Sequence, residues 1–204
     1  MQVEIIGVTR YLQGDGSSES LLEHAGRTCY RSEPKGAAGK FLQSRIGEGH
    51  ESIVEHASVT FDIRGISRAC SHQLVRHRIA SYSQESQRYV DMSAPEFVVP
   101  PSISGTPEAM AVWEEFMGQV SRAYRGLRAL GVRKEDARFV LPNATCTRII
   151  VTMNLRSLRH FFSVRCDKSA QWEIRALALE MLRQVYVLAP SVFGDLYQQH
   201  IASG

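Results

Sequence analysis

The spacing of apolar residues constrains the fold of this 204-residue chain more than any other feature of its sequence. From Ala170 to Leu188, apolar side chains recur at intervals of three and four residues, the period of a helix that buries one face. Similar spacing predicts further helices over residues 20–30, 41–46, 66–75, 107–130, 133–140 and 154–163. Most of the chain is therefore expected to be helical.

Strand-like segments are few and short. Residues 57–63 alternate apolar and polar side chains, as a half-buried strand does, and residues 3–8, 97–99 and 147–153 are further strand candidates. No internal repeat, low-complexity segment or linker divides the chain. The sequence therefore predicts a single α+β domain over residues 1–204, with long helices around a small, twisted, mainly antiparallel sheet.

Composition excludes several classes of protein. A hydrophobic fraction of 44% with 22% charged residues is ordinary for a soluble globular chain, and it excludes disorder and collagen-like repeats. No apolar run approaches the roughly 20 residues of a membrane span, so we expect a cytoplasmic protein without membrane contact. The four cysteines are Cys29, Cys70, Cys146 and Cys166, and no two of them form a CxxC pair. This spacing favours reduced thiols over a disulfide scaffold or a zinc site, and no bound metal is expected.

Arginine supplies 20 of the 24 basic residues, although the formal net charge is only +3. Genomic base composition can produce such a bias, so the positions of the arginines must decide what they do. Residues 76–89 combine three Arg, one His, three Ser, two Gln and two Tyr with almost nothing apolar. A solvated basic loop would explain this composition, but rigid guanidinium and amide donors that alternate with aromatic rings suit a planar ring attached to a phosphate. The segment therefore favours a nucleotide as ligand.

Arg76-His77-Arg78, followed after seven residues by Ser86, resembles the RHRx7S signature of flavin-dependent thymidylate synthases. Further blocks are similar to that family and follow in its order over nearly the whole chain: His50-Glu51-Ser52 with Glu55-His56, Arg138 in Arg-Phe-Val-Leu-Pro, Asn154-Leu155-Arg156-Ser157, and Arg165 before Ala170-Gln171-Trp172-Glu173. The resemblance implies an FAD enzyme that assembles as a homotetramer, with active sites built from several subunits.

The resemblance also implies roles for individual residues. FAD would be held by Ser52, Arg76, His77, Arg78, Gln84, Asn154, Leu155, Arg156 and His160. The nucleotide dUMP would be held by Gln73, Leu74, Val75, Arg76, Gln84, Glu85, Ser86, Gln87, Arg88, Arg138 and Arg165. Ser52, Gln84 and His160 differ from commoner residues of the family but keep a hydrogen-bonding group. Cys29 stands where a Ser can touch the flavin nucleotide, and it is left out of the site.

The reaction that the resemblance implies is reductive methylation of dUMP to dTMP, with methylenetetrahydrofolate as carbon donor and NADPH as reductant through FAD. C5 of uracil is a poor nucleophile, so a guanidinium that stabilises the anionic ring would push electron density towards it. Arg165 is the expected catalytic residue. Ser86 is assigned to binding, because no base is paired with it and the family mechanism needs no enzyme nucleophile.

Two other functions stay open at this point. An Arg-rich RNA-binding domain without catalysis could use the Arg-Ser-Tyr segment to stack bases. A protein that binds flavin and nucleotide without turnover is the second. A visible flavin spectrum separates the first from both flavin-based interpretations, and release of label from C5 of dUMP separates catalysis from binding.

Overall fold

The structure is a computed structural model that describes residues 1–34 and 36–203. Its centre is a four-stranded antiparallel sheet in the order β1-β2-β4-β3. The strands are β1 (Gln2–Val8), β2 (Ser58–Ser67), β3 (Ala80–Gln84) and β4 (Cys146–Asn154). The predicted strands over 3–8, 57–63 and 147–153 are thus confirmed, and so is the expected combination of a small antiparallel sheet with many helices.

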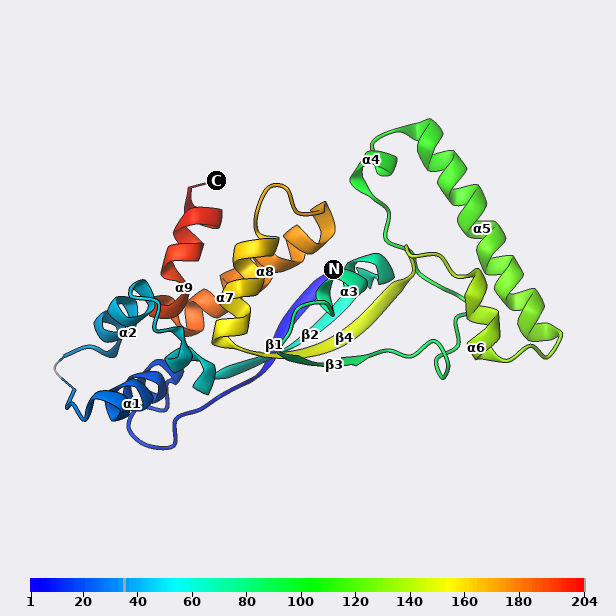
Figure 1. The fold of residues 1–204 in the computed structure, drawn as a ribbon. Coiled ribbons are helices and arrows are strands. Elements are labelled where there is room, and N and C mark those ends of the chain that lie inside the picture. The colour runs from blue at the N-terminus through cyan, green and yellow to red at the C-terminus, as the bar shows by residue number, and fades with distance from the viewer. Residues whose placement is uncertain (35, 204) are drawn as a thin grey trace.

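Helices lie on one side of the sheet and beyond it at both ends (Figure 1). The helices α7 (Leu155–Arg165), α8 (Trp172–Leu188) and α9 (Pro190–Tyr197) pack together beside the sheet, while α1 (Ser18–Tyr30) and α2 (Ala38–Gly47) lie at one end. The remaining elements are η1 (Glu51–His56), α3 (Arg68–Leu74), α4 (Pro101–Ser104), α5 (Pro107–Ala129), α6 (Lys134–Ala137), η2 (Arg138–Val140) and η3 (Gln198–Ala202). None of these described helices is both long enough and apolar enough to cross a bilayer.

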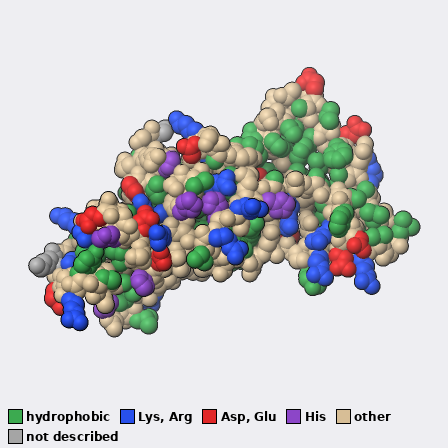
Figure 2. Space-filling model, in the orientation of Figure 1, with side chains coloured by type: hydrophobic (Ala, Val, Ile, Leu, Met, Phe, Trp, Pro, Cys, Tyr) green, Lys and Arg blue, Asp and Glu red, His purple; other side chains and the backbone are tan. Residues whose placement is uncertain are grey.

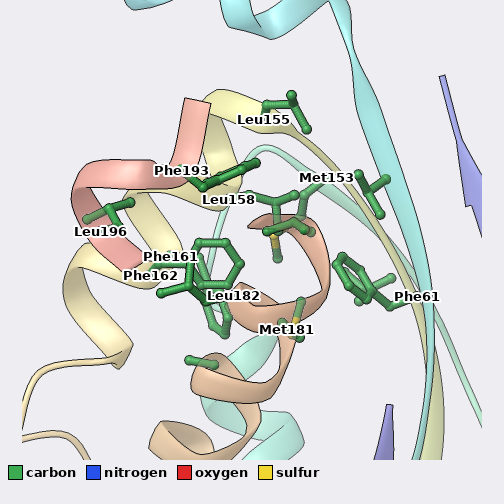
Figure 3. Packing of buried hydrophobic residues seen from close by; sticks show 14 of the residues in the cluster. Phe61, Met153, Leu155, Leu158, Phe161, Phe162, Met181, Leu182, Phe193 and Leu196 are labelled. Carbon is green, nitrogen blue, oxygen red and sulfur yellow. The ribbon is translucent and has the colours of Figure 1, made fainter. Parts of the chain in front are cut away.

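The main core lies between the sheet and the helices α7, α8 and α9. Figure 3 shows Phe161 and Phe162 of α7 beside Phe193 of α9, with Phe61 of β2 facing them across the core. All four rings are fully buried, and the ring centroids of Phe162 and Phe193 lie 5.7 Å apart with the rings nearly perpendicular. This packing fixes α7 against the sheet, so that both ends of α7 have defined positions.

A second, smaller cluster stabilises the end of the molecule that contains α5 and α6. Met92, Tyr124 and Ala137 are its buried members, and Tyr124 accepts a hydrogen bond from the Met92 backbone N–H on its hydroxyl oxygen at 3.3 Å. The cluster joins α5 to α6 away from the sheet, as Figure 1 shows. Only three residues of the 23-residue α5 are buried, so most of this helix has no partner within the described part of the chain.

Some expected elements differ from the structure. Residues 76–89 were expected to lack a period, but they contain β3, whose outward positions carry small serines instead of the apolar residues that reveal most strands. Ile66 belongs to β2 and not to the next helix, because Ser67 caps α3 by accepting the N–H of Cys70 on its hydroxyl. Phe97 forms only an isolated bridge to Thr145, so a strand over 97–99 was wrong.

The helical segments need two further corrections. Residues 133–140 form the short α6 followed by the 3-10 turn η2, so a single helix there was wrong. The helix α9 and the turn η3 follow Pro190 and were not predicted. Pro190 is the first residue of α9, a position where proline is tolerated because its missing N–H would have no partner in the helix.

Candidate active site

The turn between α3 and β3 carries Arg76, His77 and Arg78. Tyr82 holds this turn, because its hydroxyl donates to the carbonyl oxygens of Leu74 at 2.9 Å and of His77 at 2.8 Å. Burial raises the pKa of Tyr82 to about 12, so this hydroxyl keeps its proton. Arg76 and Arg78 are exposed on either side of the half-buried His77. The turn therefore presents two cations on a fixed backbone.

The C-terminal end of α7 meets this turn. Arg165 donates from Nε to Nε2 of His77 at 2.8 Å, and the His77 ring lies against the edge of Phe161 with centroids 4.9 Å apart. His160, five residues before Arg165 on α7, lies 6.1 Å from His77 by ring centroids. Burial, Arg165 and His160 lower the pKa of His77 to about 4, so its imidazole is neutral at pH 7 and can accept this bond.

The other end of α7 borders a pocket of about 390 Å³. Asn154 caps the helix, since its side-chain oxygen accepts the N–H of Ser157 at 2.8 Å. Arg156 lines the pocket and pairs with the Glu55 carboxylate. The other lining residues come from α1, η1 and the segment before it: Ala25, Gly26, Cys29, Tyr30, Gly49, His50, Ser52, Ile53 and His56.

This pocket offers groups that a nucleotide cofactor uses. The Tyr30 ring stacks at 22° on His50, and the hydroxyl of Tyr30 lies 2.8 Å from Nδ1 of His50. Ser52 and Arg156 add a hydroxyl and a guanidinium to these flat rings. A flat, polar and partly cationic lining suits FAD, so these residues fit the flavin cofactor that the resemblance implies. Cys29, left out of the expected site, lines the pocket as well.

The loop after β3 contains Ser86, the last residue of the signature, and leads to the smaller cluster. The hydroxyl oxygen of Ser86 accepts the backbone N–H of Arg88 at 3.3 Å, and Arg88 pairs with Glu135 of α6 at 3.1 Å. Lys134 donates to the carbonyl oxygen of Tyr89 at 2.8 Å. Arg138 begins η2 and donates from Nε to the carbonyl oxygen of Glu135 at 3.1 Å. The loop therefore joins the sheet to the part of the chain that carries Arg138.

Several predicted ligands have structural partners. Gln84 donates from its amide to the hydroxyls of Ser71 at 2.8 Å and Thr147 at 3.2 Å, which holds β3 against α3 and β4. Glu85 donates its backbone N–H to the carbonyl oxygen of Arg148 at 2.9 Å and so continues the strand pairing. Gln73 and Gln87 are half-buried. These residues belong to the frame of the site, and their free groups stay candidates for binding.

Three predicted site residues have apolar side chains that belong to the main core or pack against it. Leu74 is fully buried, Leu155 is 2% exposed, and Val75 packs against the same core. Figure 3 shows Leu155 above the cluster formed by Leu158 and its neighbours. A ligand contact from the buried Leu74 or Leu155 would therefore use the backbone, and all three assignments stay predictions.

The charges of the site are unbalanced. Arg76, Arg78, Arg138 and Arg165 form no ion pair with any described residue, whereas Arg159 binds Asp195. Sequence reasoning missed Arg68, which is half-buried. Its burial and the neighbouring charge of Arg138 both lower the pKa of Arg68. No motif distinguished Arg68 from other arginines, since only the fold brings it near Arg138. Figure 2 shows Lys, Arg and His side chains gathered between the α7–α9 helices and the α5 end.

An anionic ligand with a planar ring is what this arrangement can bind. Unpaired guanidiniums recognise phosphate and anionic ring edges, and the flat pocket beside α7 suits a nucleotide. The fold and the candidate site thus indicate the class of nucleotide-binding proteins, with one group of candidate ligand residues at each end of α7.

Comparisons with known proteins identify the class more closely. Residues 11–191 match the sequence model of a family described as "thymidylate synthase complementing protein". The chain is 53% identical to the flavin-dependent thymidylate synthase of Geobacter sulfurreducens over 90% of this chain and 84% of the relative. It is 40% identical to the enzyme of the same name from Mycobacterium marinum, over 100% of this chain and 93% of the relative. For the Pyrococcus furiosus enzyme the identity is 51%, over 72% of this chain and 62% of the relative. The chain belongs to the family of flavin-dependent thymidylate synthases.

Proposed function

We propose that this chain makes dTMP by reductive methylation of dUMP, with methylenetetrahydrofolate as carbon donor and NADPH as reductant through FAD. Membership of the flavin-dependent thymidylate synthases supports a methyltransferase that uses flavin. The observation that carries the proposal is the set of arginines around the turn 76–79 and the C-terminal end of α7 that have no ion-pair partner among the described residues. Nothing in the comparisons supports the RNA-binding alternative.

Arg165 stabilises the pyrimidine anion in this proposal. The ring carbonyls of uracil withdraw electrons from C5, and a guanidinium at the N3–O4 edge favours the electron-rich form that attacks a carbon donor. An arginine with a pKa above about 12 does not act as a base, so its contribution is a fixed charge with directed N–H groups. The hydrogen bond from Arg165 to His77 uses Nε and leaves the Nη groups for substrate.

The phosphate of dUMP is assigned to Arg76, Arg88 and Arg138, because guanidiniums bind phosphate oxygens with paired hydrogen bonds. Ser86 is a binding residue and not a nucleophile. Its hydroxyl oxygen accepts the N–H of Arg88, and no histidine or carboxylate among the described residues hydrogen-bonds to it. Gln73, Gln84, Glu85 and Gln87 complete the proposed dUMP site.

FAD is assigned to the groups at the N-terminal end of α7 and beside the turn: Ser52, Arg78, Asn154, Arg156 and His160. When bound, the cofactor would supply the hydride that NADPH provides. Ser52 and Arg156 would bind its polar groups from the pocket wall, and Arg78 would offer a charge that no described residue neutralises.

We further assign residues 1–204 to one functional unit that assembles as a homotetramer in the cytoplasm. Exposed apolar side chains along α5 and after α6 support assembly: Val112 (71% exposed), Phe116 (51%), Leu130 (82%) and Phe139 (83%). Figure 2 shows apolar side chains gathered on this end of the molecule. All four cysteines are free thiols, which agrees with a reducing compartment.

A label-release assay tests the proposed function. The protein is incubated with dUMP that carries deuterium at C5, methylenetetrahydrofolate and NADPH, and both released label and dTMP are measured. We expect a yellow protein and release that depends on all three substrates. A colourless protein that cannot be loaded with FAD, or label retained at C5 in an FAD-loaded protein, would refute the proposal.

A further inference from the structure

The contact between His77 and Arg165 joins two parts of the site that lie 88 residues apart in sequence. Arginine Nε carries a single hydrogen, and in this structure that hydrogen points at Nε2 of His77 at 2.8 Å. Because the guanidinium is planar, fixing Nε sets the plane of the whole group. The four Nη hydrogens then have defined directions, and they are the donors that a substrate can reach.

His77 is itself held in place from two sides. Its carbonyl oxygen accepts the Tyr82 hydroxyl at 2.8 Å, which fixes the backbone of the turn from β3. Its ring packs edge-on against the buried Phe161 of α7, with centroids 4.9 Å apart. A side chain restrained on both backbone and ring can orient a neighbour better than a surface residue can.

His77 must be neutral to accept the bond. The charged and titratable groups near its ring are Arg165 and His160 on α7, while β3 offers the Tyr82 hydroxyl to its carbonyl. Among the described residues, no carboxylate hydrogen-bonds to His77 and so none favours its protonated form. Burial and these two neighbours keep the pKa of His77 at about 4. The ring nitrogen is therefore an acceptor at pH 7.

We propose that His77 is a positioning residue for Arg165, because its contact with Nε orients the guanidinium towards the pyrimidine ring. This inference rests on the proposed function, because it gives Arg165 a substrate to face. Loss of the orientation should lower turnover more than dUMP binding, since a guanidinium that rotates freely still supplies charge but seldom matches the developing anion.

A double-mutant cycle tests the inference. His77→Ala should lower kcat at saturating dUMP by about 10²-fold, the order expected for a misplaced catalytic group, with little change in KM. His77→Gln should recover most of that loss, because its amide oxygen can accept the bond from Arg165. In the Arg165→Ala background, His77→Ala should lower kcat by less than about threefold, since contacting residues are not additive. His72→Ala, an exposed position on α3, is the matched control.

FAD content is measured in each variant by absorbance. If His77→Ala releases FAD while the FAD-loaded fraction keeps the wild-type kcat, His77 is a flavin ligand and the inference is overturned. Independent losses of kcat that multiply in the double variant would overturn it equally.

A readout without turnover separates this inference from the proposed function. In a nitrogen NMR titration of the FAD-loaded wild type, His77 should stay neutral down to about pH 4, and its pKa should rise in Arg165→Ala. If His77 titrates at an ordinary pKa and does not respond to Arg165→Ala, the contact is absent and the inference fails even if dTMP is formed. If the contact is present but no variant or wild type releases label from C5, the proposed function fails and the positioning role for this reaction fails with it.

Discussion

Arg165 combines a favourable electrostatic position with the absence of a described carboxylate partner. It lies in the last turn of α7, where the helix dipole favours a positive charge. Most exposed arginines gain little from an ion pair, but a half-buried arginine usually has a partner. For Arg165 the described partner is a neutral imidazole. A cation held in this way keeps its full charge for a ligand.

The first prediction compares Arg165 with Ser86. Arg165→Ala should lower turnover at saturating dUMP by about 10²–10³-fold, the usual effect of removing one preorganised donor from a site without water. Arg165→Lys should recover little, because an ammonium lacks the planar fork. Ser86→Ala should raise KM for dUMP and keep measurable turnover, as loss of uniform binding does. Steady-state kinetics with FAD content checked in each variant decides. If Arg165→Ala stays active while Ser86→Ala binds dUMP without turnover, Ser86 is the catalytic residue and Arg165 a binding residue.

The second prediction concerns the pH dependence of stability at His77. Its pKa is about 4 in the folded chain, against an ordinary value of 6.5. Between these values the unfolded chain binds a proton that the folded chain does not, so the free energy of unfolding falls as pH is lowered through this range. His77→Gln removes that proton from both states and should lose less stability. Urea denaturation at about pH 7 and about pH 5 measures the difference. Parallel losses in both proteins would contradict the low pKa.

At the scale of elements, the sequence predicts best where the hydrophobic period is long. The helix α8 and the strands β2 and β4 bury continuous faces, and their periods are visible in the sequence. The strand β3 is hidden because it alternates serines with half-buried residues at the edge of the sheet. The helix α9 packs on α8 and α2, which is tertiary information that no local period contains.

The resemblance proposes the residues of the candidate site but not the contacts between them. The resemblance selects Arg165 and His77, yet nothing in the sequence pairs them, because the pairing follows from how α7 packs against the turn before β3. Likewise, Arg68 approaches Arg138 only in the folded chain. The resemblance also selects Leu155, whose side chain belongs to the core, so the sequence does not show that any ligand contact there would use the backbone.

The third prediction separates two roles of Asn154 in α7. Its side-chain oxygen caps the helix, and its amide N–H groups form no bond with the described residues. Asn154→Ala should lower the free energy of unfolding by about 1 kcal/mol through loss of the cap, whereas Asn154→Ser keeps a capping oxygen. If the amide also binds FAD, both variants should retain less FAD after dilution. Denaturation and flavin absorbance are measured together. Wild-type FAD retention in Asn154→Ser would limit Asn154 to capping.

At the scale of the whole molecule, the chain has a large core at the sheet and a small one under α5. The small cluster buries only Met92, Tyr124 and Ala137. The helix that it anchors exposes apolar residues over much of its length, and exposed apolar surface of this kind marks an interface. The proposed tetramer would cover this surface.

The fourth prediction tests that assembly. Phe116→Glu places a charge on the exposed apolar face of α5 and should shift the protein from a tetramer to smaller species, because a buried carboxylate without a partner opposes association. Ala111→Glu adds the same charge about 140° around the helix and serves as the control. Light scattering coupled to size-exclusion chromatography measures both masses. An unchanged tetramer in Phe116→Glu would place the interface elsewhere. A monomeric wild type would exclude the interface.

The separation of the two cores has a consequence for local unfolding. A cluster of three buried residues should open far more often than the main core, so amides of α5 and α6 should exchange with solvent through local fluctuations. Arg138 belongs to that region, whereas Arg165 ends α7, a helix that packs into the main core. A dUMP molecule held by both arginines, in one chain or between neighbouring chains, would make each opening of the small cluster require release of the ligand. Substrate would then slow amide exchange in α5 and α6, far from the bound ring, and dUMP itself would turn two separately fluctuating regions into one cooperative unit.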